Sequence, residues 1–366
     1  MRKVFSPAFI ATLLALVYCL WVVATASDSL ALVTLGEAWV PTELQQSSYT
    51  KEGYDGQFSY LLARYGWEST PYIDNAPYRA QRILLPVMAR TLSFGQVDWL
   101  PWIMLAINLG ALFMGTWALE QLLILKRQNR WIALGFGLSL GMLGSVRLIV
   151  TEPLAYALIV LAILQIEKER VYLGVFLIGI SALAKEMTLI FALAYGVWWL
   201  WQRDWRNVLI GGLLMGVPAL LWQVVLLNQF GKLGIGSGGA LATPFEIIPL
   251  MGFFRLLTDG SLEVFLALGG IVFMFAVLPA LWGLWVCLRD KSWSIWTAIL
   301  FFNALLMLFV PFSTYREILG ILRFIVGLQI AVILYAAHNR LRRPLMYSTL
   351  WAFTTLFVIF SDVGTL

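Results

Sequence analysis

The chain has 366 residues, of which 61% are hydrophobic and 12% are charged. An ordinary soluble domain carries roughly 25% charged residues, so this composition excludes a water-soluble globular protein and indicates one that crosses a membrane several times. The formal net charge of +5 follows from the unequal distribution of lysine and arginine across a membrane, and gives no reason to expect a nucleic-acid partner.

Apolar segments close to the ~20-residue length of a bilayer crossing follow one another along the chain. We predict an all-α polytopic protein, a single transmembrane domain over 1–366, with about eleven spans within a range of about ten to twelve. The three spans between 153 and 201 are shorter than a full crossing. The predicted spans are 8–26, 99–125, 131–149, 153–167, 171–184, 187–201, 207–229, 262–288, 293–311, 317–337 and 345–361.

Basic clusters fall at alternate ends of these spans, and cytoplasmic loops retain lysine and arginine. We therefore predict an N-in, C-out protein with an extracytoplasmic first loop over 27–98. The lack of an appended soluble domain favours a bacterial plasma (inner) membrane. The same parity requires a hairpin near Ala184-Lys185-Glu186. The clusters are Arg2/Lys3, Lys126/Arg127/Arg130, Lys168/Arg170, Arg203/Arg206, Arg289/Lys291 and Arg340/Arg342/Arg343.

The amino-terminal apolar run has two interpretations. It could be a cleavable signal peptide, but its length of about 19 residues favours a retained anchor. Cys19 and Cys287 both lie within apolar spans, so we expect buried free thiols and no disulfide.

The beginning of the first loop predicts a short helix. Phe58, Leu61, Leu62 and Tyr65 are spaced so that they share one helical face. This helix would lie in the outer membrane interface, with Asp55 at or just before its amino terminus, where exposed backbone amides favour a carboxylate. Asp55 could thus be a functional acid or only a helix cap.

The later part of the loop, 74–82, predicts a turn and then a helix start at Pro77, because proline is favoured at the first helical position. Arg79 and Arg82 are three residues apart and share a face. They could extend toward bilayer phosphates, or hold the phosphate of one bound lipid, whose oxygens match the guanidinium fork.

Charged residues at the outer ends of the spans point to a site. A charge costs roughly 2.5–3.5 kcal/mol at the bilayer centre on insertion scales, so it usually faces a cavity or a partner. Opposed charges in three outer turns and in the first loop predict one cation-rich cavity that opens outward; solvated turn residues with local ion pairs are the alternative. These residues are Arg147, Glu152, Lys185, Glu186, Arg316, Glu317 and Arg323.

The second outer loop, 230–261, begins with a glycine-rich stretch over 231–239. Glycine spacing without a preceding strand is weak evidence for phosphate binding. It favours instead a mobile loop that could gate the cavity, followed by a second interfacial helix over 245–257.

Several short motifs together resemble a known superfamily. An acidic residue in Tyr54-Asp55-Gly56-Gln57-Phe58, within a first outer loop and followed by many spans, resembles the GT-C integral-membrane glycosyltransferases. The local match is to a bacterial group in that superfamily that forms cell-surface glycopolymers. The segments similar to that group's pattern are 78–86 (YRAQRILLP), 151–153 (TEP) and 183–186 (LAKE).

The resemblance implies a sugar donor carried on a polyprenyl phosphate, with a cell-envelope glycan or glycolipid as acceptor on the extracytoplasmic side. It implies catalysis by Asp55, which would act as the base of an inverting displacement, while cations stabilise the leaving phosphate. No cofactor is required, although Asp55 with Glu152 could hold a divalent cation. The candidate substrate-binding residues are Gln57, Tyr78, Arg79, Gln81, Arg82, Arg147, Glu152, Lys185, Glu186, Tyr315, Arg316 and Arg323.

Two other functions remain open. A flippase or transporter of lipid-linked sugars would also carry charges in its spans, with broken helices and an internal repeat near the bilayer midplane. A noncatalytic membrane subunit would tolerate the loss of Asp55.

Overall fold

The structure is a computed structural model that describes residues 5–47 and 50–365. Within these residues the chain folds into α-helices with short 3₁₀ and π segments and forms no strand, apart from an isolated bridge between Gly36 and Thr50. Helix formation satisfies backbone polar groups within each segment, as a lipid environment requires. The all-α prediction is confirmed.

Ten α-helices precede the turn at 202–204 in the described residues. Their bounds are α1 Pro7–Ala26, α2 Gly56–Tyr65, α3 Ala76–Ala80, α4 Leu84–Leu92, α5 Leu100–Leu125, α6 Leu134–Gly137, α7 Ser145–Arg147, α8 Glu152–Glu167, α9 Val171–Ala182 and α10 Leu189–Trp201. The remaining bounds are α11 Trp205–Phe230, α12 Met251–Arg255, α13 Leu262–Val272, α14 Leu278–Arg289, α15 Ile295–Met307, α16 Phe312–Tyr315, α17 Ile318–Phe324, α18 Val326–His338, α19 Arg342–Ser348 and α20 Leu356–Thr365.

In the part of the chain that the structure describes, five helical stretches are long and apolar enough to cross a membrane. A sixth is formed if α17 and α18, which meet at a 42° bend, are one span. The count of eleven spans and their sidedness stay predictions. The five stretches are Pro7–Ala26, Val97–Leu125, Trp205–Phe230, Leu268–Arg289 and Arg342–Asp362, and the shorter apolar helices are Val171–Ala182, Glu186–Trp201 and Ile295–Met307.

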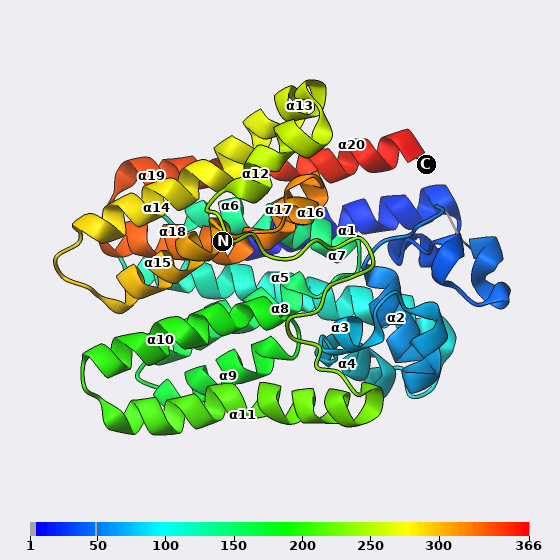
Figure 1. The fold of residues 1–366 in the computed structure, drawn as a ribbon, viewed down its shortest axis with the longest axis horizontal. Helices are drawn as coiled ribbons and strands as arrows, with labels where there is room; N and C mark the ends of the chain where they lie inside the picture. Colours follow the sequence, from blue (N-terminus) through cyan, green and yellow to red (C-terminus); the bar gives the residue numbers. More distant parts are fainter. Residues whose placement is uncertain (1–4, 48–49, 366) are drawn as a thin grey trace.

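The long helices run side by side along the long axis of the molecule (Figure 1). The short helices α2, α3 and α4 gather at one end, whereas the turns 202–204 and 290–294 lie at the other. Arg203 and Lys291 belong to these turns, so two of the basic clusters lie far from the first loop. In the centre α5 packs against α1 and α8, and α8 packs against α9.

The predicted span 131–149 is not one helix. It divides into α6, a π-helical turn over Leu140–Gly144 and α7, with extended backbone at Ser139. There the backbone N–H of Leu140 donates to Thr354 Oγ1 at 3.0 Å instead of to a carbonyl of its own helix. A Cβ on Gly141 would lie 2.1 Å from a methyl carbon of Val326. Neighbouring segments approach so closely here that the position has no room for a side chain, which explains the glycine.

The predicted hairpin near 184–186 is present as a break between helices. Helix α9 ends at Ala182 and α10 begins at Leu189, with a 3₁₀ turn over Glu186–Thr188 between them. The Leu183 carbonyl accepts a hydrogen bond at 3.0 Å from the backbone N–H of Leu84, which begins α4. The hairpin therefore anchors the first loop.

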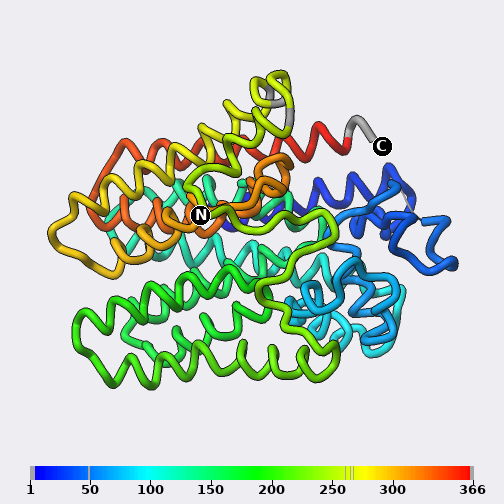
Figure 2. Tube along the Cα trace, viewed as in Figure 1, coloured from blue at the N-terminus to red at the C-terminus, as the bar shows by residue number. Residues whose placement is uncertain are grey.

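Residues 231–250, which we call the strap, join α11 to α12 without a helix and cross the molecule past α3 (Figures 1 and 2). The interfacial helix predicted over 245–257 begins only at Met251. Pro244 and Pro249 disfavour helix before that point. The backbone N–H groups of Glu246 and Leu250 instead donate to the carbonyls of Phe309 and Leu308 at 3.0 and 2.6 Å.

Both cysteines are free and buried, as predicted. Cys19 lies in α1 and Cys287 in α14.

Candidate functional site

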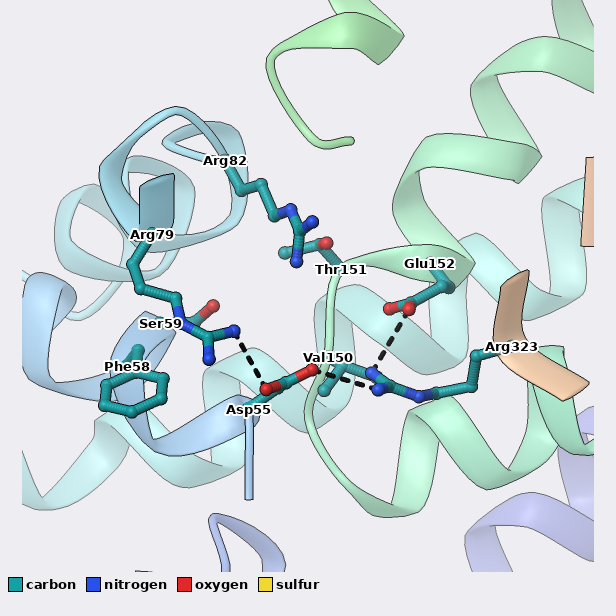
Figure 3. Close-up of a pocket in the computed structure, with 9 residues that line it drawn as sticks. All are labelled: Asp55, Phe58, Ser59, Arg79, Arg82, Val150, Thr151, Glu152 and Arg323. Carbon is teal, nitrogen blue, oxygen red and sulfur yellow. Dashed lines mark hydrogen bonds and ion pairs between the residues drawn. The ribbon is translucent and has the colours of Figure 1, made fainter. Parts of the chain in front are cut away.

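Asp55 precedes α2 but makes no capping hydrogen bond to its backbone. Its Oδ1 instead accepts from Arg79 Nη1 at 2.8 Å, and its Oδ2 accepts from Arg323 Nη2 at 2.9 Å (Figure 3). The next residue must be small, because a Cβ on Gly56 would lie 2.1 Å from the carbonyl oxygen of Leu148. The carboxylate is thus held between two guanidinium groups, and the alternative of a simple cap has no support here.

Arg79 comes from α3, whose start is set by Pro77. Its Nε and Nη2 donate to both oxygens of Asp74 at 2.8 and 2.9 Å, in a bidentate pair. The guanidinium lies 4.3 Å from the centre of the Phe58 ring, a cation–π distance. Arg79 is therefore fixed on three sides, and its remaining bond orients Asp55.

Arg323 comes from α17 and bridges two acids. Its Nη1 donates to Glu152 Oε1 at 3.2 Å, while its Nη2 binds Asp55. Lys185 Nζ donates to the same Glu152 oxygen at 2.6 Å. Glu152 begins α8 and Lys185 lies in the α9–α10 hairpin. The fold thus brings to Glu152 one partner 33 positions away and another 171 positions away in the chain.

Arg82 lies just after α3 and points toward the same cavity (Figure 3). Its Nε and Nη2 bind both oxygens of Glu186 at 2.9 and 2.6 Å, and Nη2 also donates to the Tyr78 hydroxyl at 2.8 Å. Among the described residues no partner is seen for its Nη1. Arg82 therefore keeps two N–H groups for an anionic ligand.

These side chains enclose a cavity of about 10 Å³, enough for roughly one water molecule. Ser59 and Thr151 add hydroxyl groups for which the described structure shows no hydrogen bond. The ion-pair network at the cavity is electrically balanced. Its four carboxylates and four cations are Asp55, Asp74, Glu152 and Glu186, and Arg79, Arg82, Lys185 and Arg323. The cavity is lined by Asp55, Phe58, Ser59, Arg79, Arg82, Val150, Thr151, Glu152 and Arg323.

The electrostatics keep Asp55 ionised. Burial alone would raise the pKa of this carboxyl, but the positive charges of Arg79 and Arg323 outweigh burial and hold the pKa below its usual range. The pKa of Asp74 is likewise lowered, because hydrogen bonds from Arg79 outweigh its burial. The side chain of Asp55 is 31% exposed.

Several predicted site residues lie elsewhere. Arg147 makes a bidentate pair with Asp362, at 2.6 and 2.8 Å, and does not contact Glu152. The Tyr315 hydroxyl is buried and donates to the carbonyl of Met307 at 2.8 Å. Neither side chain lines the cavity, so their predicted role in substrate binding has no geometric support.

Three more predicted residues do not line the cavity. The Gln57 amide binds the loop backbone, accepting from Gly36 N at 3.0 Å and donating to Glu52 O at 2.9 Å. Gln81 is buried beside Gly234 of the strap. Arg316 is exposed and donates to the strap carbonyl of Leu241 at 3.2 Å. Their contacts shape the first loop and the strap.

Sequence reasoning missed Asp74, Ser59 and Thr151. Asp74 stands five residues before Arg79, and this spacing of opposite charges in a loop was the available signal. Ser59 and Thr151 are ordinary hydroxyl residues whose relevance appears only when α2 and α8 meet. Thr151 does lie within the TEP motif.

A divalent cation between Asp55 and Glu152 would compete with Arg323, which already occupies the space between these carboxylates. The described residues contain no group of three or more histidine, cysteine, aspartate or glutamate side chains that could hold a metal ion.

Comparisons of the chain with protein-family models, with curated proteins and with solved structures return no match. The functional interpretation therefore depends on the geometry of the site and on the motifs.

Proposed function

We propose that this protein is a GT-C-type membrane glycosyltransferase that moves a sugar from a polyprenyl-phosphate donor to a cell-envelope glycan or glycolipid on the extracytoplasmic side. One observation carries the proposal. An ionised carboxylate, Asp55, and a guanidinium with free N–H groups, that of Arg82, line the same cavity. A base and an anion-binding group are the two elements that this transfer needs.

In the proposed reaction an acceptor hydroxyl oxygen attacks the anomeric carbon from the face opposite the phosphate. Its proton passes to Asp55, a new C–O bond forms, and the anomeric C–O bond to phosphate breaks with inversion. The bonding electrons leave with the phosphate oxygen. This group stays anionic, so it needs cations instead of a general acid, and Arg82 with Arg79 supplies them.

Asp55 is a weak base while both arginines bind it. A donor phosphate at Arg79 and Arg82 would neutralise part of the positive field and raise the pKa of the carboxyl. The carboxylate would therefore become a better proton acceptor only when the donor is in place.

Substrate entry requires a wall to move, because the enclosed space holds about one water. The strap is the segment best placed to do so. Asn75 Nδ2 donates to the Gly238 carbonyl at 2.6 Å, and the Ala240 N–H donates to Asp74 Oδ2 at 3.0 Å. The strap therefore covers Arg79 and contacts its carboxylate partner.

A flippase of lipid-linked sugars is the second candidate. Arg323 lies on α17, and the bend of 42° between α17 and α18 is the kind of broken helix that transporters use. The site charges, however, gather around the first loop, α8 and the α9–α10 hairpin at helix ends.

The test uses the purified protein in liposomes with a radiolabelled polyprenyl-phosphate sugar and a membrane extract as acceptor. We expect label to appear in a glycan or glycolipid product. Movement of the intact donor across the bilayer, with no product, would favour the flippase; neither transfer nor movement would favour the noncatalytic subunit.

A further inference from the structure

Arg147 and Asp362 form a buried ion pair outside the cavity that Asp55 lines. Arg147 Nε and Nη2 donate to the two oxygens of Asp362 at 2.6 and 2.8 Å, and the Tyr18 hydroxyl donates to Asp362 Oδ2 at 2.5 Å. The two charged side chains, from α7 and α20, are only 5% and 8% exposed. We call this pair the clamp. A buried ion pair adds little net stability, so stability alone does not account for it.

The rest of the Arg147 guanidinium holds the beginning of the first loop. Its Nη1 donates to the carbonyl of Ala31 and to Thr34 Oγ1, both at 3.2 Å. The Thr34 carbonyl in turn accepts a hydrogen bond at 2.9 Å from the backbone N–H of Tyr54, the residue that precedes Asp55. The clamp is therefore linked to Asp55 through Thr34 and Tyr54.

The turn that follows Arg147 contacts the other side of Asp55. Gly56, the residue after Asp55, lies against the carbonyl oxygens of Leu148 and Ile149, because a Cβ on this glycine would lie 2.1 and 3.1 Å from them. The same turn continues into two residues that line the cavity. Both chain neighbours of Asp55 are thus held by segments that begin at Arg147 or are bonded to it.

Each of these two segments contains a β-branched residue in left-handed backbone. The φ angle is 54° at Thr34 and 47° at Ile149. Such a conformation is strained for a β-branched side chain, persists only where surrounding contacts impose it, and concentrates at functional sites. Arg147 is the residue common to both segments, since it bonds Thr34 and lies two positions before Ile149.

We propose that Arg147 and Asp362 are positioning residues that hold Asp55 in its catalytic place by fixing these two strained segments. The inference rests on the proposed function, in which Asp55 is the base. Catalytic groups must be held closely, because a displacement of about 1 Å can lower a rate by about a hundredfold. The proposal gives Arg147 a role that requires no contact with the substrate.

The test measures single-turnover transfer, with each rate counted per molecule that has bound donor, so unfolded protein does not lower it. Asp362→Asn removes the charge of the clamp. Arg147→Lys keeps the charge, but an ammonium group lacks the planar fork that binds Asp362 and the first loop together. Each variant should lower the rate at least about tenfold. Donor affinity should change less than about twofold, because Arg79 and Arg82 keep their own carboxylate partners.

Glu120→Gln is the matched control. Glu120 lies in α5, its side chain is 3% exposed, and it pairs with Arg130 at 3.1 Å. This variant loses an acid as buried as Asp362 but without a bond to the first loop, so it should keep the wild-type rate per bound donor. An equal loss in Glu120→Gln would overturn the proposal. So would wild-type rates in the clamp variants, or a loss of donor affinity without a loss of rate.

Amide hydrogen exchange tests the clamp independently of transfer. The Tyr54 N–H, which the Thr34 carbonyl protects, should exchange at least about fivefold faster in Asp362→Asn and in Arg147→Lys, and at the wild-type rate in Glu120→Gln. Unchanged exchange in the clamp variants would overturn the inference whatever the activity. If the wild-type protein transfers no sugar, the proposed function fails, and exchange at Tyr54 still decides whether the clamp fixes the segment around Asp55.

Discussion

At the scale of residues, the site is a balanced network in which no acid is far from a cation. Glu152 is the centre of its buried part, since it binds both Lys185 and Arg323 and its side chain is 2% exposed. A buried pair adds little net stability, but removal of one partner leaves an uncompensated charge. The network should therefore be sensitive to single substitutions.

Glu152→Gln should lower the free energy of unfolding by about 3–5 kcal/mol, because two buried cations lose their shared carboxylate. Glu43→Gln is the control. Glu43 pairs with Arg64 at 3.5 Å but is 59% exposed, and an exposed pair contributes only about 0–1 kcal/mol. Denaturant unfolding in detergent measures both variants. An equal loss in the two would contradict the buried network.

The pH dependence of transfer should report the lowered pKa of Asp55. A carboxyl whose pKa lies below its usual ~4 stays ionised through the physiological range, so kcat/KM should lose no activity to its protonation above about pH 4. Donor phosphate compensates the arginines and raises this pKa, so the acidic limb of kcat should lie at higher pH than that of kcat/KM. Initial-rate profiles over pH test this order. A reversed order would assign the base elsewhere.

At the scale of elements, the strap connects the first loop to the last third of the chain. Its contacts include Asn75 and Asp74 on one side and Ser313 on the other, where Thr243 N donates to the serine Oγ at 3.0 Å. The glycine-rich sequence allows this close passage. A Cβ on Gly239 would lie 2.7 Å from Arg79 Nη2 and 2.8 Å from Asp74 Oδ2.

Gly239→Val should therefore weaken closure of the strap by roughly 1–3 kcal/mol, the usual cost of overpacking. Amide hydrogen exchange over 234–243 should accelerate by about five- to a hundredfold. Ala240→Val, at an exposed neighbouring position, should change exchange little. Unchanged exchange in Gly239→Val would show that the strap does not pack on Arg79.

At the scale of the whole molecule, the helices of the first loop lie at one end and the turns 202–204 and 290–294 at the other. These turns contain Arg203 and Lys291, which belong to two of the basic clusters. In a protein without Cys19 and Cys287, Glu52→Cys and Ile235→Cys should react with an impermeant maleimide in intact cells. Gln202→Cys and Ser292→Cys should react only after permeabilisation, because basic turns stay in the cytoplasm. Labelling of Ser292→Cys in intact cells would show that this turn is outside and would contradict the predicted topology.

The sequence predicts which charged residues lie near one another better than it predicts the helices and partners that position them. Glu152 and Arg323 were identified because charges are costly in spans, whereas Asp55, Arg79 and Arg82 were identified from the motif and the helical spacing of the first loop; all five line one cavity. The partner of Arg147 could not be foreseen, because Asp362 is 215 positions away. The pairing of Arg147 with Asp362 follows from packing between distant segments, which charge patterns do not encode.

Hydropathy also could not predict where a helix is interrupted. The span 131–149 is mostly apolar, yet Ser139 and the neighbouring glycines break it where it meets other segments. In the strap, Pro244 and Pro249 were sufficient to argue against a helix from 245, and the apolar residues between them misled the prediction.

The most direct measurement is the single-turnover rate of sugar transfer by Asp55→Asn, with donor binding measured in parallel. Asp98→Asn, an exposed acid outside the cavity, is the control. If Asp55 is the base, Asp55→Asn should bind the donor and lose at least about a hundredfold in rate, the least that such a base usually contributes, while Asp98→Asn keeps the wild-type rate. Transfer by Asp55→Asn at the wild-type rate would contradict the assignment of Asp55 and leave its carboxylate with only a structural role.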